Sequence, residues 1–382
     1  MPRLRPREVG IVLGSLPPGG LNAITDVPGV AVGHASLVEG EAIRTGVTAI
    51  RTHAGDPFRE KTPAAAFVLN GFGKTCGLAQ VAELGVLETP VLLTGTLSVP
   101  RVADALISWT LRGNPDAVSV NPLVGECNDA YLNDIQGRHV RAEHVWAAID
   151  GARGGPVEGG AVGAGVGMTC YGYKGGVGTA SRATDGFTVG VLVLANFGTR
   201  EELRIDGVPV GRELEAGNGS PPWPSERGDD GIAAAGGRGE EGRASSGGAA
   251  RAPDGSCMVI VGTDAPLDAR QLGRIARRGG LGLARTGSVA GHGSGDFILA
   301  FSNAEPVPHR PPSTVLIRRV LAEDGPAITR LFQATVEAVE EAVVDALFRA
   351  ETTRGRDGHV RYALPIEPTL DVMRRHGRLG IP

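Results

Sequence analysis

The feature that most constrains the fold of this 382-residue chain is an abrupt change of composition just before Ser256. Residues 217–250 hold ten glycines among 34 positions, and Ser, Ala, Glu, Arg and Pro fill most of the others. Such a stretch buries too little apolar surface to offset the entropy lost on ordering, so we expect a disordered linker over about 212–254. The run that follows, 257–261, is Cys-Met-Val-Ile-Val, which predicts a strand covered on both faces. The chain therefore passes from a linker into a core strand through Gly255 and Ser256.

The overall composition is that of a globular protein. Hydrophobic residues make up 41% of the chain and charged residues 21%, which excludes wholesale disorder. The net charge of −4 and the absence of a run of about 18 apolar residues favour neither nucleic acid nor a membrane as partner. The basic N-terminal residues are not followed by an apolar segment, and the four cysteines are widely spaced. We therefore expect no secretory signal, no structural metal and a reducing, cytoplasmic location.

Local patterns predict a mixture of strands and helices. Helices are expected at about 98–109, from Asp268 to the Gly279-Gly280 pair, and over 326–350, where apolar residues recur at helical spacing. Short β-branched runs bounded by turn residues predict strands at 46–50, 66–69, 91–94, 187–194, 257–261 and 297–301. Several of these runs are apolar on both faces, which indicates a layered α/β or α+β sandwich.

Familiar catalytic motifs fail on spacing. The segment 70–75, Asn-Gly-Phe-Gly-Lys-Thr, would need a glycine at position 68 to be a phosphate loop, and Val68 stands there, so a strand-to-loop turn is favoured. The segment 163–167 lacks the dinucleotide-binding spacing, and the chain has no HExxH and no GxSxG around Ser294. The isolated histidines fit structural or surface roles better than catalytic ones: His34, His53 and His292.

The junction between Gly255 and Ser256 suits an N-terminal nucleophile. A serine hydroxyl can attack the carbonyl of the residue before it, convert the amide to an ester, and leave water to cleave the ester. Glycine at position 255 tolerates the strained backbone that this attack requires. The new α-amine, with a pKa of about 8, would then lie beside its own hydroxyl and could accept its proton. The simpler interpretation, that Ser256 only begins a strand after a loop, stays open on composition alone.

Several segments together resemble one family in its own order. The chain is similar to the self-processing L-aminopeptidase/D-esterase-amidase and β-aminopeptidase family from about residue 10 to 365, apart from the linker. The similar segments are 22–34, 44–50, 131–134, 174–182, 189–198, 254–267 and 287–297. The resemblance implies a four-layer αββα sandwich and cleavage into an α-chain, 1–255, and a β-chain that begins with the nucleophile, 256–382.

The resemblance also implies roles for individual residues. Ser256 aligns with the nucleophile, and Ser294 with Asp296 aligns with the pair that completes a Ser-Ser-acid constellation. The β-aminopeptidases carry Glu where this chain has Asp296, whereas similar nylon-oligomer hydrolases carry the shorter acid. Asn196 aligns with the oxyanion-hole amide, and Tyr131 is expected in the substrate pocket. Without the resemblance, positions 294–296 also fit a turn before a strand, and Asn196 fits a strand-end turn.

Two further polar residues, Asp264 and Lys174, are candidates for structural or substrate-binding roles. Asp264 fits a turn or helix cap, and Lys174 lies in a glycine-rich loop where it either touches substrate or is structural. The activity that the resemblance implies is that of a self-cleaving serine aminopeptidase or amidase. It would release N-terminal amino acids, with D- and β-amino acids in the implied substrate class, from short peptides, amides or esters through an acyl-enzyme on Ser256, without cofactor. We expect it to form a homo-oligomer, with a tetramer as one form. The alternatives are acetyl transfer of the ornithine acetyltransferase type, whose nucleophile is Thr rather than Ser256, and an uncleaved, non-enzymatic binding protein.

Overall fold

The structure is a computed structural model that describes residues 3–216 and 255–379. The expected linker lies outside the described residues except at its start. Residues 212–216, which were expected in the linker, instead form the end of helix α4 (Val210–Ala216). The first described range therefore ends with helix α4, and the second begins at Gly255, directly before a strand that starts at Ser256.

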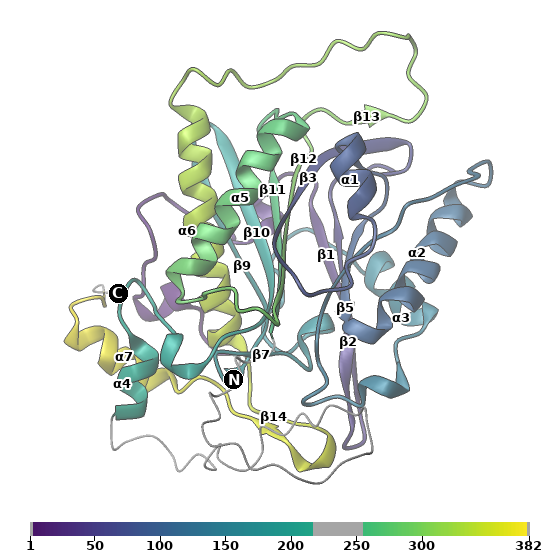
Figure 1. The fold of residues 1–382 in the computed structure, drawn as a ribbon. Helices are drawn as coiled ribbons and strands as arrows, with labels where there is room; N and C mark the ends of the chain where they lie inside the picture. Colours follow the sequence, from purple (N-terminus) through teal and green to yellow (C-terminus); the bar gives the residue numbers. More distant parts are fainter. Residues whose placement is uncertain (1–2, 217–254, 380–382) are drawn as a thin grey trace, which may run out of the picture.

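Two β-sheets form the centre of the molecule (Figure 1). The larger sheet has seven strands in the order β13-β3-β12-β11-β10-β9, with β4 paired to β3, and the smaller has the order β1-β2-β5-β6. The strands of the larger sheet are β3 (Glu60–Gly71), β4 (Val86–Leu87), β9 (Gly176–Thr184), β10 (Phe187–Asn196), β11 (Ser256–Thr263), β12 (Gly295–Ser302) and β13 (Val307–Pro308). The strands of the smaller sheet are β1 (Ala31–Glu39), β2 (Ile43–Arg51), β5 (Val91–Gly95) and β6 (Leu123–Cys127).

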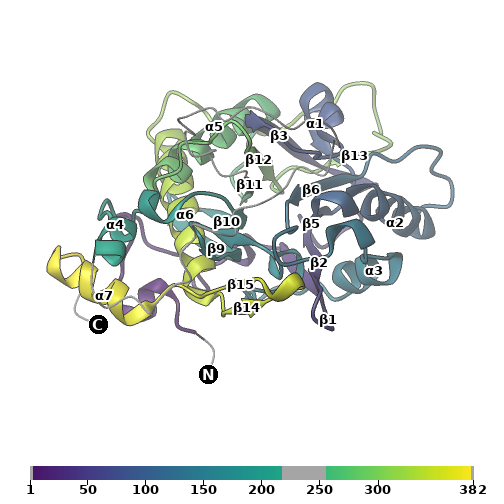
Figure 2. The same ribbon diagram turned by 60° about the horizontal axis from the view of Figure 1, so that its bottom comes forward.

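Helices cover the outer face of each sheet and complete four layers, as Figures 1 and 2 show. Alternate residues of β10 and β11, such as Val191 and Val259, pack against helices α5 (Ala269–Arg285) and α6 (Ala327–Arg349). Their neighbours, such as Leu192 and Met258, pack between the two sheets. The other face of the smaller sheet is covered by α2 (Val99–Gly113) and α3 (Ala142–Asp150). The expected αββα sandwich is therefore confirmed.

The remaining elements lie around this sandwich. Helices α1 (Leu78–Leu84) and α7 (Ile366–Arg375) flank it, together with two short hairpins. The hairpins are β7 (Thr169–Cys170) with β8 (Tyr173–Lys174), and β14 (Thr353–Arg354) with β15 (Val360–Arg361). No helix in the described ranges is both long and apolar enough to cross a bilayer.

All six expected strands lie within strands of the two sheets, and the three expected helices correspond to α2, α5 and α6. The expected end of α5 at Gly279-Gly280 was wrong, because the helix continues to Arg285. Glycines of α5 serve close packing rather than termination: a Cβ on Gly279 would lie 2.9 Å from Cγ2 of Ile298 on β12, and a Cβ on Gly282 would lie 2.6 Å from the Cβ of Val339 on α6. These two helices therefore pack closely against each other on the outer face of the larger sheet.

Buried ion pairs fix α6 to the sheet below it. Arg182 of β9 is fully buried and donates to Glu341 of α6 at 2.7 Å, and Arg7 from the N-terminal segment donates to the same carboxylate. Burial opposes the ionisation of Glu341, but the two arginines outweigh it and hold the pKa of that carboxyl below its usual value. Removal of one partner would leave an uncompensated buried charge, which is strongly destabilising.

Candidate active site

Ser256 is the first residue of β11, at the end of the larger sheet. Its neighbours across the sheet are Asn196, the last residue of β10, and Gly295, the first residue of β12. The serine is 3% exposed, and its Oγ accepts a hydrogen bond from the backbone N–H of Asn128 at 3.1 Å. All eight residues of β11 are buried, so the strand fixes the backbone from which this hydroxyl projects.

Two N–H donors converge on the Ser256 hydroxyl. The side-chain Nδ2 of Asn196 lies 3.3 Å from Ser256 Oγ and also donates to the carbonyl of Asn128 at 3.1 Å. The Oδ1 of Asn196 accepts from the backbone N–H of Thr169 at 2.8 Å, which fixes the orientation of the amide. Together, the Asn196 amide and the Asn128 N–H form an arrangement of donors that can stabilise an oxyanion next to Oγ. The backbone donor at Asn128 was missed by the sequence analysis, because a main-chain N–H leaves no residue signature.

Ser294 and Asp296 form a second buried pair. The Ser294 hydroxyl donates to Asp296 Oδ1 at 2.8 Å, and the two residues are 4% and 1% exposed. Burial raises the pKa of Asp296 to about 6, although the bond from Ser294 acts in the opposite direction. The second oxygen, Oδ2, is buried and accepts no hydrogen bond from the part of the chain that the structure describes. This carboxylate can therefore accept one more donor, such as an ammonium group.

The Ser294–Asp296 pair is connected to Ser256 through the backbone and not through a side-chain hydrogen bond among the described residues. Asp296 lies beside Cys257 in the register of β11 and β12, and Gly295 lies beside Ser256. Because side chains alternate along a strand, the Asp296 side chain projects on the face opposite to the Ser256 hydroxyl. No hydrogen bond joins the Ser294 or Asp296 side chain to Ser256 Oγ among the described residues. The backbone N–H of Gly295 instead donates to the carbonyl of Gly255 at 3.2 Å.

Two buried carboxylates adjoin the site and were missed by the sequence analysis. Glu126, on β6, is 2% exposed and accepts from the backbone N–H of Lys74 at 2.9 Å and from the hydroxyl of Thr96. Asp129 follows Asn128 in the loop after β6, and burial raises its pKa to about 6. Neither residue belongs to a recognisable motif, and β6 itself was not predicted.

The other residues considered from the sequence have structural surroundings. The ring of Tyr131 stacks on His359 at 4.6 Å between ring centroids, and the guanidinium of Arg361 lies 3.6 Å from its centroid. The β14–β15 hairpin therefore packs on Tyr131, three residues beyond Asn128 in the chain, and the place of Tyr131 in a substrate pocket stays a prediction. Asp264 accepts from the backbone N–H of Thr188 at 2.7 Å, in agreement with a turn residue.

Lys174 does not face substrate. It is 0% exposed, and its Nζ donates to the carbonyls of Gly165, Met168 and Gly175 at 2.8–2.9 Å. Burial lowers its pKa to about 7. Because Met168 directly precedes Thr169, whose N–H orients Asn196, the amine supports the backbone that holds the Asn196 amide.

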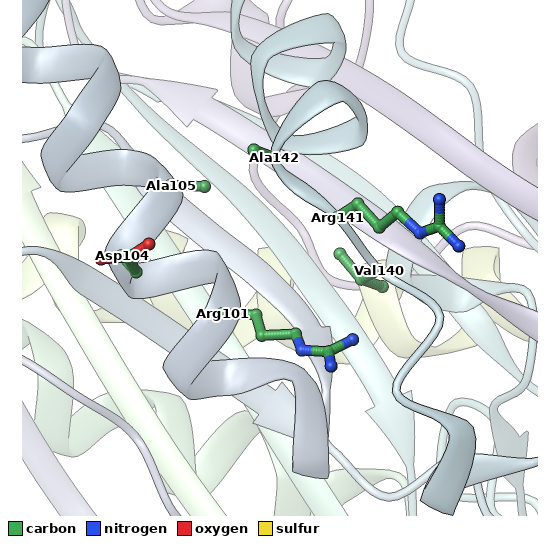
Figure 3. Close-up of a pocket in the computed structure, with 6 residues that line it drawn as sticks. All are labelled: Arg101, Asp104, Ala105, Val140, Arg141 and Ala142. Atoms are coloured by element: carbon green, nitrogen blue, oxygen red, sulfur yellow. The ribbon is translucent and has the colours of Figure 1, made fainter.

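A surface cavity of about 340 Å³ lies between α2 and α3 (Figure 3). It is lined by Arg101, Asp104, Ala105, Val140, Arg141 and Ala142. None of the residues considered for catalysis lines it, so the candidate site remains the end of β11.

Comparison with known proteins decides the family. The model of peptidase family S58 matches residues 22–361, which is most of the chain. The chain belongs to peptidase family S58. The chain is 38% identical to the β-peptidyl aminopeptidase BapA of Sphingosinicella xenopeptidilytica, over 97% of this chain and 91% of that protein.

Solved structures of related proteins support the same family assignment for this S58 peptidase. A β-aminopeptidase of Burkholderia sp. superposes with a TM-score of 0.85 at 38% identity, covering 99% of this chain and all of that one. The L-aminopeptidase D-Ala-esterase/amidase of Ochrobactrum anthropi, described as a variant of the Ntn hydrolase fold, gives 0.85 at 34% identity with full coverage of both chains. The protein is thus an aminopeptidase/amidase with an N-terminal nucleophile hydrolase fold. Neither acetyl transfer nor a non-enzymatic role finds support.

Proposed function

We propose that the Gly255–Ser256 bond is cleaved by the chain itself and that Ser256 is then the acylated nucleophile. The observation that carries this proposal is the position of Ser256 Oγ at the head of a buried strand, with the Asn196 amide and the Asn128 N–H both directed at it. In addition, the carbonyl of Gly255 accepts a hydrogen bond from Gly295, which polarises the bond to be cut. Serine on a strand end with preset oxyanion donors is an arrangement typical of acyl transfer.

The proposed reaction has two stages after maturation. Ser256 Oγ attacks the scissile carbonyl and passes its proton to its own α-amine, while the oxygen of the substrate takes up negative charge beside Asn196 and Asn128. The α-amine then returns the proton to the leaving amine, and an ester on Oγ remains. Water attacks this ester by the same route, releases the acid and restores the hydroxyl.

Ser294 and Asp296 act, in this proposal, on the α-amine of Ser256. Their side chains lie on the face of β11 opposite to the hydroxyl, and the α-amine that cleavage frees at the head of β11 is the group of Ser256 that they would bind. The free Oδ2 of Asp296 and the Ser294 hydroxyl would stabilise the ammonium form that appears when the amine accepts the proton.

The names of the relatives support substrates with a free N-terminal amine, namely short peptides, amides or esters that include β-amino acids or D-residues. Such an amine is an ammonium group at neutral pH and is best held by a nearby carboxylate. Glu126 and Asp129, two residues before and one after Asn128, supply this negative charge in the present chain.

Two further properties are proposed with it. All four cysteines are free, which supports a reducing compartment such as the cytoplasm. Exposed apolar side chains in the segment between β13 and α6, including Val315 at 72% and Ile317 at 98%, support assembly of several copies. Light scattering on purified protein tests whether several copies assemble.

The activity is tested with purified protein and a panel of L-, D- and β-aminoacyl amides. Release of the amine by the wild type, with none by Ser256→Ala, is the expected result. Hydrolysis by Ser256→Ala at the wild-type rate would contradict the assignment of the nucleophile. Ser302→Ala is the matched control, since Ser302 is equally buried at the far end of β12, where its hydroxyl donates to Ala265.

A further inference from the structure

The side chain of Asn70 is bound to the loop that carries Ser294. Asn70 lies near the end of β3, and its Nδ2 donates to the carbonyls of Gly291 and Ser294, both at 2.6 Å. A third, longer contact of 3.2 Å reaches the carbonyl of His292. Three carbonyl acceptors around one nitrogen require the NH2 end of the amide to face the loop, because only that end donates.

These bonds hold both ends of a tight turn. The turn runs from Gly291 to Ser294 and is closed by a hydrogen bond from the N–H of Ser294 to the carbonyl of Gly291 at 2.9 Å. The carbonyl of Ser294 also accepts from the N–H of Phe72, two residues beyond Asn70. The end of β3 therefore fixes the turn through one side chain and one backbone group.

The backbone fixed in this way carries two groups of the proposed machinery. Asn70 is the register partner of Asp296, at a point where the pairing of β3 and β12 shifts between Asp296 and Phe297. The bond from Ser294 Oγ to Asp296 Oδ1 spans only two residues, so its length depends on the backbone angles between them. Between them lies Gly295, whose N–H binds the carbonyl of Gly255.

We propose that Asn70 is a positioning residue that sets the Ser294–Asp296 pair and the Gly295 N–H against the Gly255–Ser256 segment. The proposal rests on the proposed roles of Ser256, Ser294 and Asp296. It also gives a role to Asn70, the first residue of the segment 70–75, which resembles a phosphate loop only in composition. The amide acts here through carbonyls of its own chain and touches no substrate.

The test compares Asn70→Ala and the isosteric Asn70→Asp with Asn303→Ala. Asn303 is a matched control because its Nδ2 also donates to two carbonyls, those of Pro28 and Thr52 at 2.7 and 2.9 Å, at the other end of β12. We expect both Asn70 variants to lose kcat by roughly 10- to 100-fold, the scale set by small misplacements of reacting groups. KM and the thermal midpoint should change no more than in Asn303→Ala.

The pH dependence of kcat separates positioning from general stability. The bond from Ser294 favours the ionised form of Asp296, so its loss in the Asn70 variants should move the acid limb of the kcat profile to higher pH. Asn303→Ala should keep the wild-type profile. All rates are expressed per cleaved chain, counted by mass spectrometry, because the same displacement can also slow cleavage.

Either of two results would overturn the inference. One is wild-type kcat and an unchanged acid limb in both Asn70 variants, and the other is loss of soluble protein in both variants while Asn303→Ala remains folded. If Ser256→Ala retains activity, the proposed function fails instead, whatever Asn70 does. Dependence on Ser256 without dependence on Asn70 removes this inference alone.

Discussion

Asp296 lies beside Cys257, and not beside Ser256, in the parallel pairing of β11 and β12. Because paired residues of parallel strands project on the same face, the Asp296 carboxylate and the Cys257 thiol share one buried face, where burial and that carboxylate raise the pKa of the thiol well above its usual value. The Ser256 hydroxyl projects from the other face, toward Asn128 and Asn196. The same end of the sheet therefore presents the Ser256 hydroxyl to the Asn128 and Asn196 donors on one face and the Asp296 carboxylate on the other.

Asp296→Asn should lower kcat more than it raises KM, because the charge is needed when the α-amine becomes ammonium. With a pKa of about 6, Asp296 should give the wild type an acid limb near that pH, and the variant should lack it. Asp296→Glu, the acid of the resembling β-aminopeptidases, should retain far more activity. Full activity in cleaved Asp296→Asn would exclude Asp296 from the mechanism.

The same substitution should stabilise the fold. The pKa of Asp296 is higher in the folded state than its ordinary value of 3.8, so the folded state binds the proton more tightly. Stability from this group is therefore lost as the pH rises from about 4 to 6. Above pH 6, Asp296→Asn should be more stable than the wild type by about 1–3 kcal/mol, and at pH 4 the difference should vanish. Urea denaturation at both pH values measures the difference in the free energy of unfolding. An equal difference at pH 4 and above pH 6 would show that the ionisation of Asp296 is not its cause.

Asn196→Asp should reduce kcat by roughly 100- to 1000-fold, the usual effect of losing one oxyanion donor. The substitution keeps an oxygen that can accept from the N–H of Thr169, removes the Nδ2 donor near Ser256, and puts an acceptor oxygen in its place. Steady-state kinetics on cleaved protein, with folding checked by circular dichroism, measures the effect. A loss below about threefold would assign the oxyanion to other groups.

Lys174→Met should change how stability depends on pH. The folded-state pKa of Lys174, about 7, lies below its ordinary value of 10.5 because the amine is buried. The unfolded chain therefore binds the proton more tightly, and the wild type gains stability as the pH rises from about 7 to 10, by up to a few kcal/mol. The variant should lack this rise when both are unfolded in urea. It should also lose kcat, because the loop that holds Thr169 loses its central donor.

Much of the architecture could be predicted from local sequence, because doubly covered strands such as β10 and β11 are continuous apolar runs. Strands β1, β6 and β9 were missed, since their glycines, polar residues and charges hide the alternation. The end of α5 was placed too early because a glycine that lets a helix pack closely on a strand, as Gly279 does on Ile298, looks the same in sequence as one that ends a helix.

The candidate site was predictable only where residues form a motif. Ser256, Ser294 and Asp296 stand in short recognisable segments, whereas Asn128 contributes a backbone N–H, and Asn70 contributes bonds to carbonyls of a loop more than 200 residues away. Such contacts depend on which strand ends meet at one edge of the sheet. The pairing of β3, β12, β11 and β10 determines that meeting, and no local pattern encodes it.

Intact mass and N-terminal sequencing test whether Ser256 becomes the N-terminal nucleophile. Wild-type protein should give two chains in denaturing conditions, the smaller beginning Ser-Cys-Met-Val, while Ser256→Ala should stay whole. Cys257→Ser, one residue away on the opposite face of β11, serves as the matched control and should still be cut. An active wild type that remains a single chain of 39.3 kDa, or a Ser256→Ala variant cut at the same bond, would contradict the account.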